Sequence, residues 1–160
     1  MFTKVDLGVA VAGDSNGDIL PVSLVRRSTF FSPGVHRVYW QTEDKNGNKT
    51  RDSQRVTVHP LVSISKDDST MEGTSHTVKV FLNGEAPSYP VTIPYTVSGS
   101  SDSDDHNLTN GSFIINSGTE GSITFSVNPD ELIEGQEELI IELDDALNLG
   151  IKSQYVLTIS

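Results

Sequence analysis

Five acidic side chains from three separated stretches of the chain could hold a cation together. They are Glu72, Asp105 and the group Asp130, Glu134 and Glu137. At a separation of about 4 Å, a like-charged pair costs roughly 1 kcal/mol in bulk water and roughly 4 kcal/mol at an effective dielectric constant near 20. Calcium would relieve that repulsion, because it accepts about 6–8 oxygen ligands in irregular loop geometry. Magnesium and transition metals fit less well, given octahedral demands or the want of His and Cys partners.

The elements that would position these acids are β-strands. In residues 61–160 apolar side chains alternate with polar ones, a period of two that indicates antiparallel strands with one face on a core. We expect about seven strands, the size of an immunoglobulin-like sandwich, at roughly 61–66, 75–82, 91–97, 111–115, 121–127, 138–143 and 153–159. Residues 130–143 are rich in helix formers, but Gly135 interrupts them, so we predict an acidic loop followed by a strand.

Successive loops of such a sandwich alternate between its two ends, so loops one, three and five share an end. Glu72 falls in loop one, Asp105 in loop three, and the other three acids in or beside loop five. The sequence therefore predicts that the acids converge. The alternative interpretation is a solvated acidic surface, which is what charged loops usually are.

Charge is divided unevenly along the chain. Residues 1–60 carry eight Lys or Arg against six Asp or Glu, whereas residues 61–160 carry three against sixteen. The second part should repel nucleic acid and anionic lipid. It suits a cation.

The first sixty residues are also predicted to be β. The candidate strands are Leu7–Ala12, Leu20–Leu24, Val35–Glu43 and Gln54–Val58. His59-Pro60 then ends the ladder, because Pro cannot donate a backbone hydrogen bond. The sequence thus predicts an all-β chain of two tandem immunoglobulin-like antiparallel sandwich modules, 1–60 and 61–160. Sixty residues is short for a sandwich, which leaves open that the first module lacks a strand or two.

Two kinds of side chain have a second possible use. Trp40 alternates with Val38 and is expected in the core, with a glycan-stacking platform as the alternative. The four histidines lack metal-ligand spacing, and we expect them on the surface or at strand edges; they are His36, His59, His76 and His106.

Residues 61–159 resemble the Calx-β family. The resemblance rests on Glu72-Gly73, on the run 91–100, on Asp104-Asp105-His106, and on the acidic segment 130–137. It implies a calcium site with Glu72, Asp105, Asp130 and Glu134 as ligands and Glu137 behind them. Pro129 stands where the family often has another Asp, and the chain stops at Ser160 before the usual closing Asp run, so we expect weak binding and fewer ions.

Residues 1–60 resemble the carboxyl part of a HYR-type Ig-like repeat. Phe31-Ser-Pro-Gly34 and the stretch Val38 to Asn48 match that family's pattern, although its usual cysteines are missing. The absence of cysteine excludes disulfides and thiolate chemistry. No nucleophile elbow, phosphate loop or zinc-protease motif is present, so we expect no enzyme.

These features together predict a calcium-binding structural or adhesive repeat of a large secreted or cell-surface protein, of bacterial origin. The chain lacks a signal peptide or an apolar run long enough to span a membrane, and we expect it to be a piece of something longer. Its partners would be neighbouring modules and a cell-surface protein or glycan, with neither nucleic acid nor membrane insertion. The alternative is an accessory glycan- or protein-binding module beside a secreted enzyme.

Overall fold

The computed structural model describes residues 1–129, 135–145 and 147–160. Every regular element in these ranges is a β-strand, which confirms the all-β fold class. The chain divides into two compact units, Met1–His59 (unit 1) and Pro60–Ser160 (unit 2). Within the described ranges, no helix is long and apolar enough to cross a membrane.

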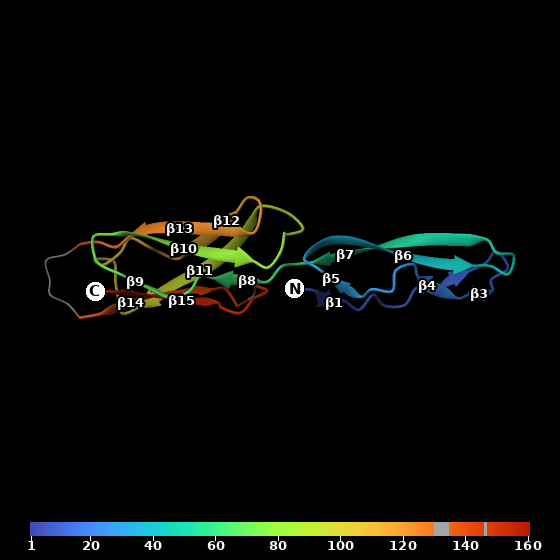
Figure 1. Cartoon of the computed structure of the whole chain (residues 1–160), viewed down its shortest axis with the longest axis horizontal. Coiled ribbons are helices and arrows are strands. Elements are labelled where there is room, and N and C mark those ends of the chain that lie inside the picture. The colour runs from blue at the N-terminus through green and yellow to red at the C-terminus, as the bar shows by residue number, and fades with distance from the viewer. Residues whose placement is uncertain (130–134, 146) are drawn as a thin grey trace. The chain divides into compact units, whose positions relative to one another are not determined.

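Unit 2 is built from two sheets (Figure 1). A three-stranded sheet has the order β13-β10-β8 and a five-stranded sheet the order β12-β11-β14-β15-β9. The strands are β8 (Val62–Ile64), β9 (Asp68–Thr70), β10 (Ser75–Leu82), β11 (Val91–Gly99), β12 (Gly111–Ile115), β13 (Glu120–Ser126), β14 (Glu137–Leu143) and β15 (Gln154–Ile159). From β10 onward, each strand lies within two residues of its expected range.

The expected first strand, 61–66, is present as the shorter β8, and β9 is a further strand in the other sheet that the sequence did not predict. β8 pairs antiparallel with β10, whereas β9 pairs parallel with β15. Asp67 explains the change of sheet, because its Oδ1 accepts hydrogen bonds from Val156 N at 2.7 Å and from Lys152 Nζ at 2.8 Å. These contacts bring the chain to the edge of β15, and the pKa of the Asp67 carboxyl is lowered by the Lys152 hydrogen bond.

The core of unit 2 lies between the inward faces of both sheets. Seventeen buried side chains form one cluster. Phe113, Leu139 and Leu157 are fully buried, from three strands of the five-stranded sheet, and Val78 and Val80 are fully buried on β10. Fully burying one such side chain contributes about 1.5–3 kcal/mol. The alternation in the sequence thus becomes a shared core, and the loops are held at its ends.

Unit 1 has less regular structure. A three-stranded sheet of order β4-β6-β7 joins β4 (Val22–Leu24), β6 (Gly34–Glu43) and β7 (Lys49–Val58). Two short ladders accompany it, made of β1 (Thr3–Lys4) with β5 (Phe30–Phe31) and β2 (Ala12–Gly13) with β3 (Ile19–Leu20). Five buried side chains form its core, namely Leu7, Phe31, Val38, Val56 and Val58.

The expected strand Leu7–Ala12 is wrong for all but its last residue. Residues 7–11 are irregular, and Ala12 begins β2. The Asp6 carboxylate accepts a hydrogen bond from Gly8 N at 2.9 Å, and Gly8 has a φ of +71°. A side-chain-capped turn with a left-handed glycine interrupts an extended strand.

Candidate functional site

The end of unit 2 that carries loops one, three and five is the candidate metal site. β13 ends and β14 begins at the same end of the unit as the start of β10 (Figure 1). This arrangement follows from the antiparallel pairing of β10 with β13 and of β11 with β14. We call the described parts of these three loops together the loop end; they are residues 71–74, 100–110, 127–129 and 135–136.

Loop one holds Glu72 in a tight turn between β9 and β10. Thr74 Oγ1 donates to Met71 O at 2.7 Å and lies 2.7 Å from Thr70 Oγ1. Gly73 adopts a φ of +72°, and a Cβ at that position would stand 3.5 Å from the Pro129 side chain. The Glu72 turn therefore packs against loop five.

Loop three holds Asp105 in a chain of capped turns. Asp105 Oδ2 accepts a hydrogen bond from Asp102 N at 2.6 Å, and Asp102 Oδ1 accepts one from Asp104 N at 2.7 Å. At the other side of the loop, Ser100 N and Ser101 N both donate to Glu138 O, at 2.9 and 3.2 Å. Loop three is thereby attached to the start of β14.

Loop five is attached to loop three through Asn128. Its backbone N–H donates to Asp105 O at 2.7 Å, and its side-chain amide donates to Asp104 O at 2.8 Å. Val127 N donates to Thr74 O at 2.8 Å, which joins the same strand end to loop one. Asp130 and Glu134 lie outside the described residues. Glu137 is the first residue of β14 and is partly buried.

At the loop end, the segments that carry Glu72 and Asp105 therefore both contact residues 127–129. Loop three also contacts the start of β14, whose first residue is Glu137. The loop end offers carboxylate and backbone oxygens, the ligands that calcium prefers. In the part of the chain that the structure describes, no group of three or more His, Cys, Asp or Glu side chains is placed to hold a metal ion. Convergence of the loops is a finding, and the five-residue ligand set stays a prediction.

His106 is a residue of this end that sequence reasoning placed wrongly. Its side chain is 6% exposed, and the residue forms an isolated bridge with Val127. Its Nδ1 accepts a hydrogen bond from Leu108 N at 3.2 Å. The ring thus supports the backbone that follows Asp105. Spacing alone cannot reveal such a role, because the partner of His106 is a backbone group and not another ligand.

His76 is the second histidine with a structural role. Its Nε2 lies 2.6 Å from the hydroxyl of Tyr155, across the two sheets. Burial lowers the pKa of His76, and the nearby charge of Asp68 opposes that shift. Burial also raises the pKa of Tyr155, with further contributions from Asp68 and Asp67.

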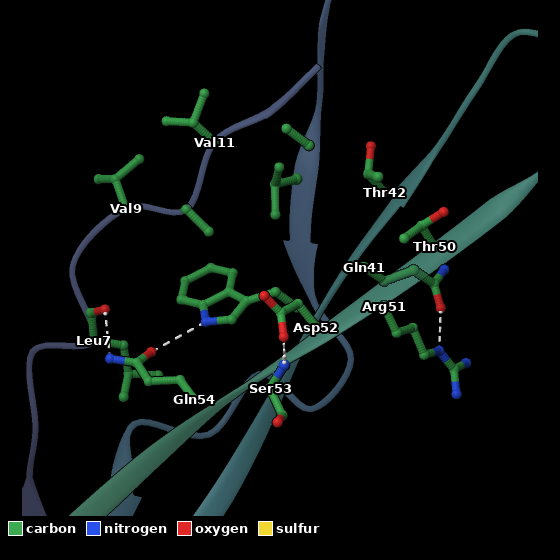
Figure 2. A pocket seen from close by; sticks show the side chains of 14 residues that line it. Leu7, Val9, Val11, Gln41, Thr42, Thr50, Arg51, Asp52, Ser53 and Gln54 are labelled. Carbon is green, nitrogen blue, oxygen red and sulfur yellow. Dashed lines mark hydrogen bonds between the residues drawn. The ribbon is translucent and has the colours of Figure 1, made fainter. Parts of the chain in front are cut away.

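Unit 1 has a separate cavity of about 440 Å³ beside Trp40 (Figure 2). The indole Nε1 donates to Gln54 Oε1 at 3.0 Å, and Gln54 Nε2 donates to Leu7 O at 3.3 Å. Trp40 is partly buried and packs against the core of unit 1, as its alternation with Val38 predicts. Val9 and Val11 border the cavity and are 91% and 79% exposed.

No family model matches the chain, and no curated protein matches it. Several solved structures are similar to it, and two of them are a calcium binding domain and an apo form. The calcium binding domain CBD12 of CALX1.1 aligns with 20% identity and a TM-score of 0.53, over 61% of this chain and 43% of that one. The apo form of the Calx CBD1 domain aligns with 16% identity and a TM-score of 0.49, over 62% of this chain and 96% of that one. The first likeness shows a Calx-β-like fold, and the chain spans less than half of that structure.

Proposed function

We propose that the chain is a calcium-binding structural module, with the ion held at the loop end of unit 2 by Glu72, Asp105, Asp130 and Glu134 and with Glu137 behind them. The observation that carries the proposal is the hydrogen bonding of Asn128 to both Asp104 and Asp105, at 2.8 and 2.7 Å. It anchors loop three two residues before Asp130. Loop one reaches the same point through Gly73 and Pro129.

The charge of the unit supports a cation as ligand. Residues 61–160 carry three Lys or Arg against sixteen Asp or Glu. Two of the three basic side chains, Lys79 and Lys152, already form ion pairs with Glu120 and Asp67. The excess of acidic over basic side chains in this part of the chain favours a cation as ligand. Calcium suits them because it accepts carboxylates in irregular geometry.

The similar structure with a TM-score of 0.53 is a calcium binding domain, and that ligand comes to this chain as part of the proposal. We expect dissociation constants for calcium of about 10⁻⁴–10⁻³ M, the range of extracellular modules. An ion that binds only the folded state adds about 2.7 kcal/mol of stability at 100 times its dissociation constant. Calcium would then stiffen the loop end and the joint to a neighbouring module.

Isothermal titration of the full chain with calcium tests the proposal. We expect heat that saturates at millimolar calcium, and at least about tenfold weaker binding for Asp105→Asn, because one anionic ligand is lost. Asp145→Asn is the matched control, since it makes the same charge change in the loop before β15, at the other end of the unit. Absence of heat at millimolar calcium, or equal losses in both variants, would contradict the site.

The wider setting belongs to the same proposal. The module would serve as an adhesive or structural repeat of a secreted or cell-surface bacterial protein, in contact with the modules on either side of it. The strong negative charge of residues 61–160 supports partners other than nucleic acid. It also disfavours binding to anionic membranes.

A further inference from the structure

The outward face of the β6–β7 hairpin in unit 1 carries a cluster of arginines. Arg37 lies on β6, directly opposite Arg55 on β7, and Arg51 lies opposite Gln41. Tyr39 stands between these two rows, opposite Ser53. All three arginines are exposed, and the Tyr39 side chain is 48% exposed. We call Arg37, Arg51, Arg55 and Tyr39 the arginine face.

The arginine face has no acidic partner in the described residues. The ion pairs among the described residues join Lys49 with Glu43, Lys79 with Glu120, and Lys152 with Asp67, and none of them includes an arginine. Two of the three guanidinium groups donate to neutral acceptors instead. Arg37 Nη1 donates to Ser53 Oγ at 3.2 Å, and Arg51 Nε donates to Gln41 Oε1 at 2.8 Å.

These contacts orient the guanidinium groups and leave their charge uncompensated. Like charges directly opposite each other on a sheet are destabilising, and the facing pair Arg37 and Arg55 lies in a chain of net charge −11. An anionic ligand bound beside the two arginines would offset the repulsion between them. Arginine suits such a ligand, because its planar fork matches carboxylate and sulfate oxygens.

Two hollows meet at Tyr39. One has a volume of about 290 Å³ and is lined by Arg51, Ser53 and Asp52, whose Oδ1 accepts a hydrogen bond from Ser53 N at 2.7 Å. The other has a volume of about 610 Å³ and is lined by Arg26 and Arg37. Tyr39 and Val25 border both. Tyr39 thus lines two hollows, and each of them is also lined by at least one arginine.

We propose that the arginine face binds an anionic polysaccharide, with a sugar ring against Tyr39 and carboxylate or sulfate groups in the two hollows. Polar groups that can hydrogen-bond sugar hydroxyls surround the ring, among them Ser53 and Gln41. An acidic protein is the alternative ligand, but it would bind the guanidinium groups alone and would leave the exposed Tyr39 ring without a role. The strongly acidic second unit disfavours a long nucleic acid.

A purely protective role for the arginines explains less of the pattern. β7 is the edge strand of its sheet, and charges on an edge strand discourage pairing with other chains. That reason covers Arg51 and Arg55 on β7. It does not cover Arg37 or Tyr39, which lie on the central strand β6.

The test is affinity electrophoresis of the full chain against heparin and polygalacturonate, with neutral dextran as reference, at low ionic strength where the Debye length exceeds about 10 Å. We expect at least one of the two anionic polymers to slow the migration of the chain and dextran to leave its migration unchanged. Arg37→Gln and Arg51→Gln should each weaken binding about tenfold, because each removes a charge-assisted hydrogen bond. Tyr39→Thr should weaken it several-fold without changing the net charge.

Lys66→Gln is the matched control, because Lys66 is an exposed cation of unit 2 and the variant loses the same charge. Its binding should equal that of the unmodified chain, and far-UV circular dichroism confirms that each variant is folded. Equal weakening by Lys66→Gln and Arg51→Gln would overturn the proposal. Absence of retardation by both polysaccharides would also overturn it. A third contradicting result would be a Tyr39→Thr variant that binds as well as the unmodified chain while polyglutamate retards the chain as much as the polysaccharides do, which would indicate an acidic protein as the ligand.

Discussion

Unit 1 and unit 2 share one alternating sequence pattern but bury very different amounts of apolar surface. The core of unit 2 has seventeen buried side chains, whereas that of unit 1 has five. Nine of the thirteen exposed large apolar side chains of the described residues belong to residues 1–59. The two units differ in what faces their main sheet. A period of two creates an apolar face, and a second layer is needed to bury it.

In unit 2, the second sheet supplies that layer. In unit 1, Leu7, Val9 and Val11 of the irregular stretch line a cavity together with residues of β6 and β7, Trp40 among them (Figure 2). A chain of about 60 residues buries only about 60% of its unfolded surface even when complete. We therefore expect unit 1 to be the less stable of the two.

The largest effect should come from removing the same side chain in each core. Phe113 is 0% exposed in unit 2 and Phe31 is 9% exposed in unit 1. Phe113→Ala should lower the free energy of unfolding of unit 2 by about 3–5 kcal/mol, the usual cost of a large cavity in a close-packed core. Phe31→Ala should cost less, because the small core of unit 1 is already open to water. Scanning calorimetry of the full chain measures both, and an equal or larger loss from Phe31→Ala would contradict the comparison.

A smaller effect should separate two glycines with positive φ. Gly99 has a φ of +133°, and a Cβ there would overlap the Glu138 carbonyl that receives Ser100 N. Gly47 has a φ of +83°, and a Cβ there would lie 3.9 Å from Glu43. Gly47→Ala should cost about 1–2 kcal/mol from backbone strain alone. Gly99→Ala should cost about 1–3 kcal/mol more from the overlap.

Urea unfolding followed by intrinsic fluorescence and circular dichroism measures these two costs. Gly99→Ala should also loosen loop three, since its attachment to Glu138 is displaced. Equal costs for the two variants would show that the close approach at Gly99 relaxes without penalty.

The next effect is a pH dependence confined to unit 2. Burial lowers the pKa of His76 below its ordinary value of 6.5. The unfolded chain then binds the proton more readily than the folded one, so stability falls as the pH drops below about 6.5 and levels off once the folded pKa is passed. Melting temperatures at pH 7.5 and 5.5 test this. The decrease should shrink in His76→Gln, and a decrease of the same size in that variant would assign the effect to other groups.

The smallest effect should come from exposed ion pairs. Lys79 pairs with Glu120 in unit 2 and Lys49 pairs with Glu43 in unit 1, and all four side chains are about half exposed. Lys79→Gln and Lys49→Gln should each change stability by about 0–1 kcal/mol. Melting curves at low and high salt would show it. A large loss from either would mean that surface charge, and not the core, separates the two units.

Much of the strand order could be predicted because alternation and turn residues are local signals. The additional strand β9 could not, because its place beside β15 depends on Asp67 meeting Val156 from the far end of the chain. The irregular course of residues 7–11 depends on the Asp6 cap at Gly8. A single hydrogen bond of this kind competes with a strand and leaves no periodic signature.

The candidate site, too, could be predicted only in part from the sequence. Loop order predicted that the stretches of Glu72 and Asp105 would meet loop five, and Gly73, Asn128 and Pro129 join them there. The directions of the carboxylates could not be predicted, because they depend on local capping such as that of Asp105 on Asp102 N. The burial of His106 could not be predicted, since its hydrogen-bond partner is a backbone amide.

The most direct test of calcium binding at the loop end is the thermal unfolding of the full chain during a calcium titration. We predict that the transition of unit 2 rises with calcium, by about 10 °C at 100 times the dissociation constant, that chelator reverses the rise, and that the transition of unit 1 stays in place. Transitions that do not move, or that move together in both units, would contradict a calcium site at the loop end.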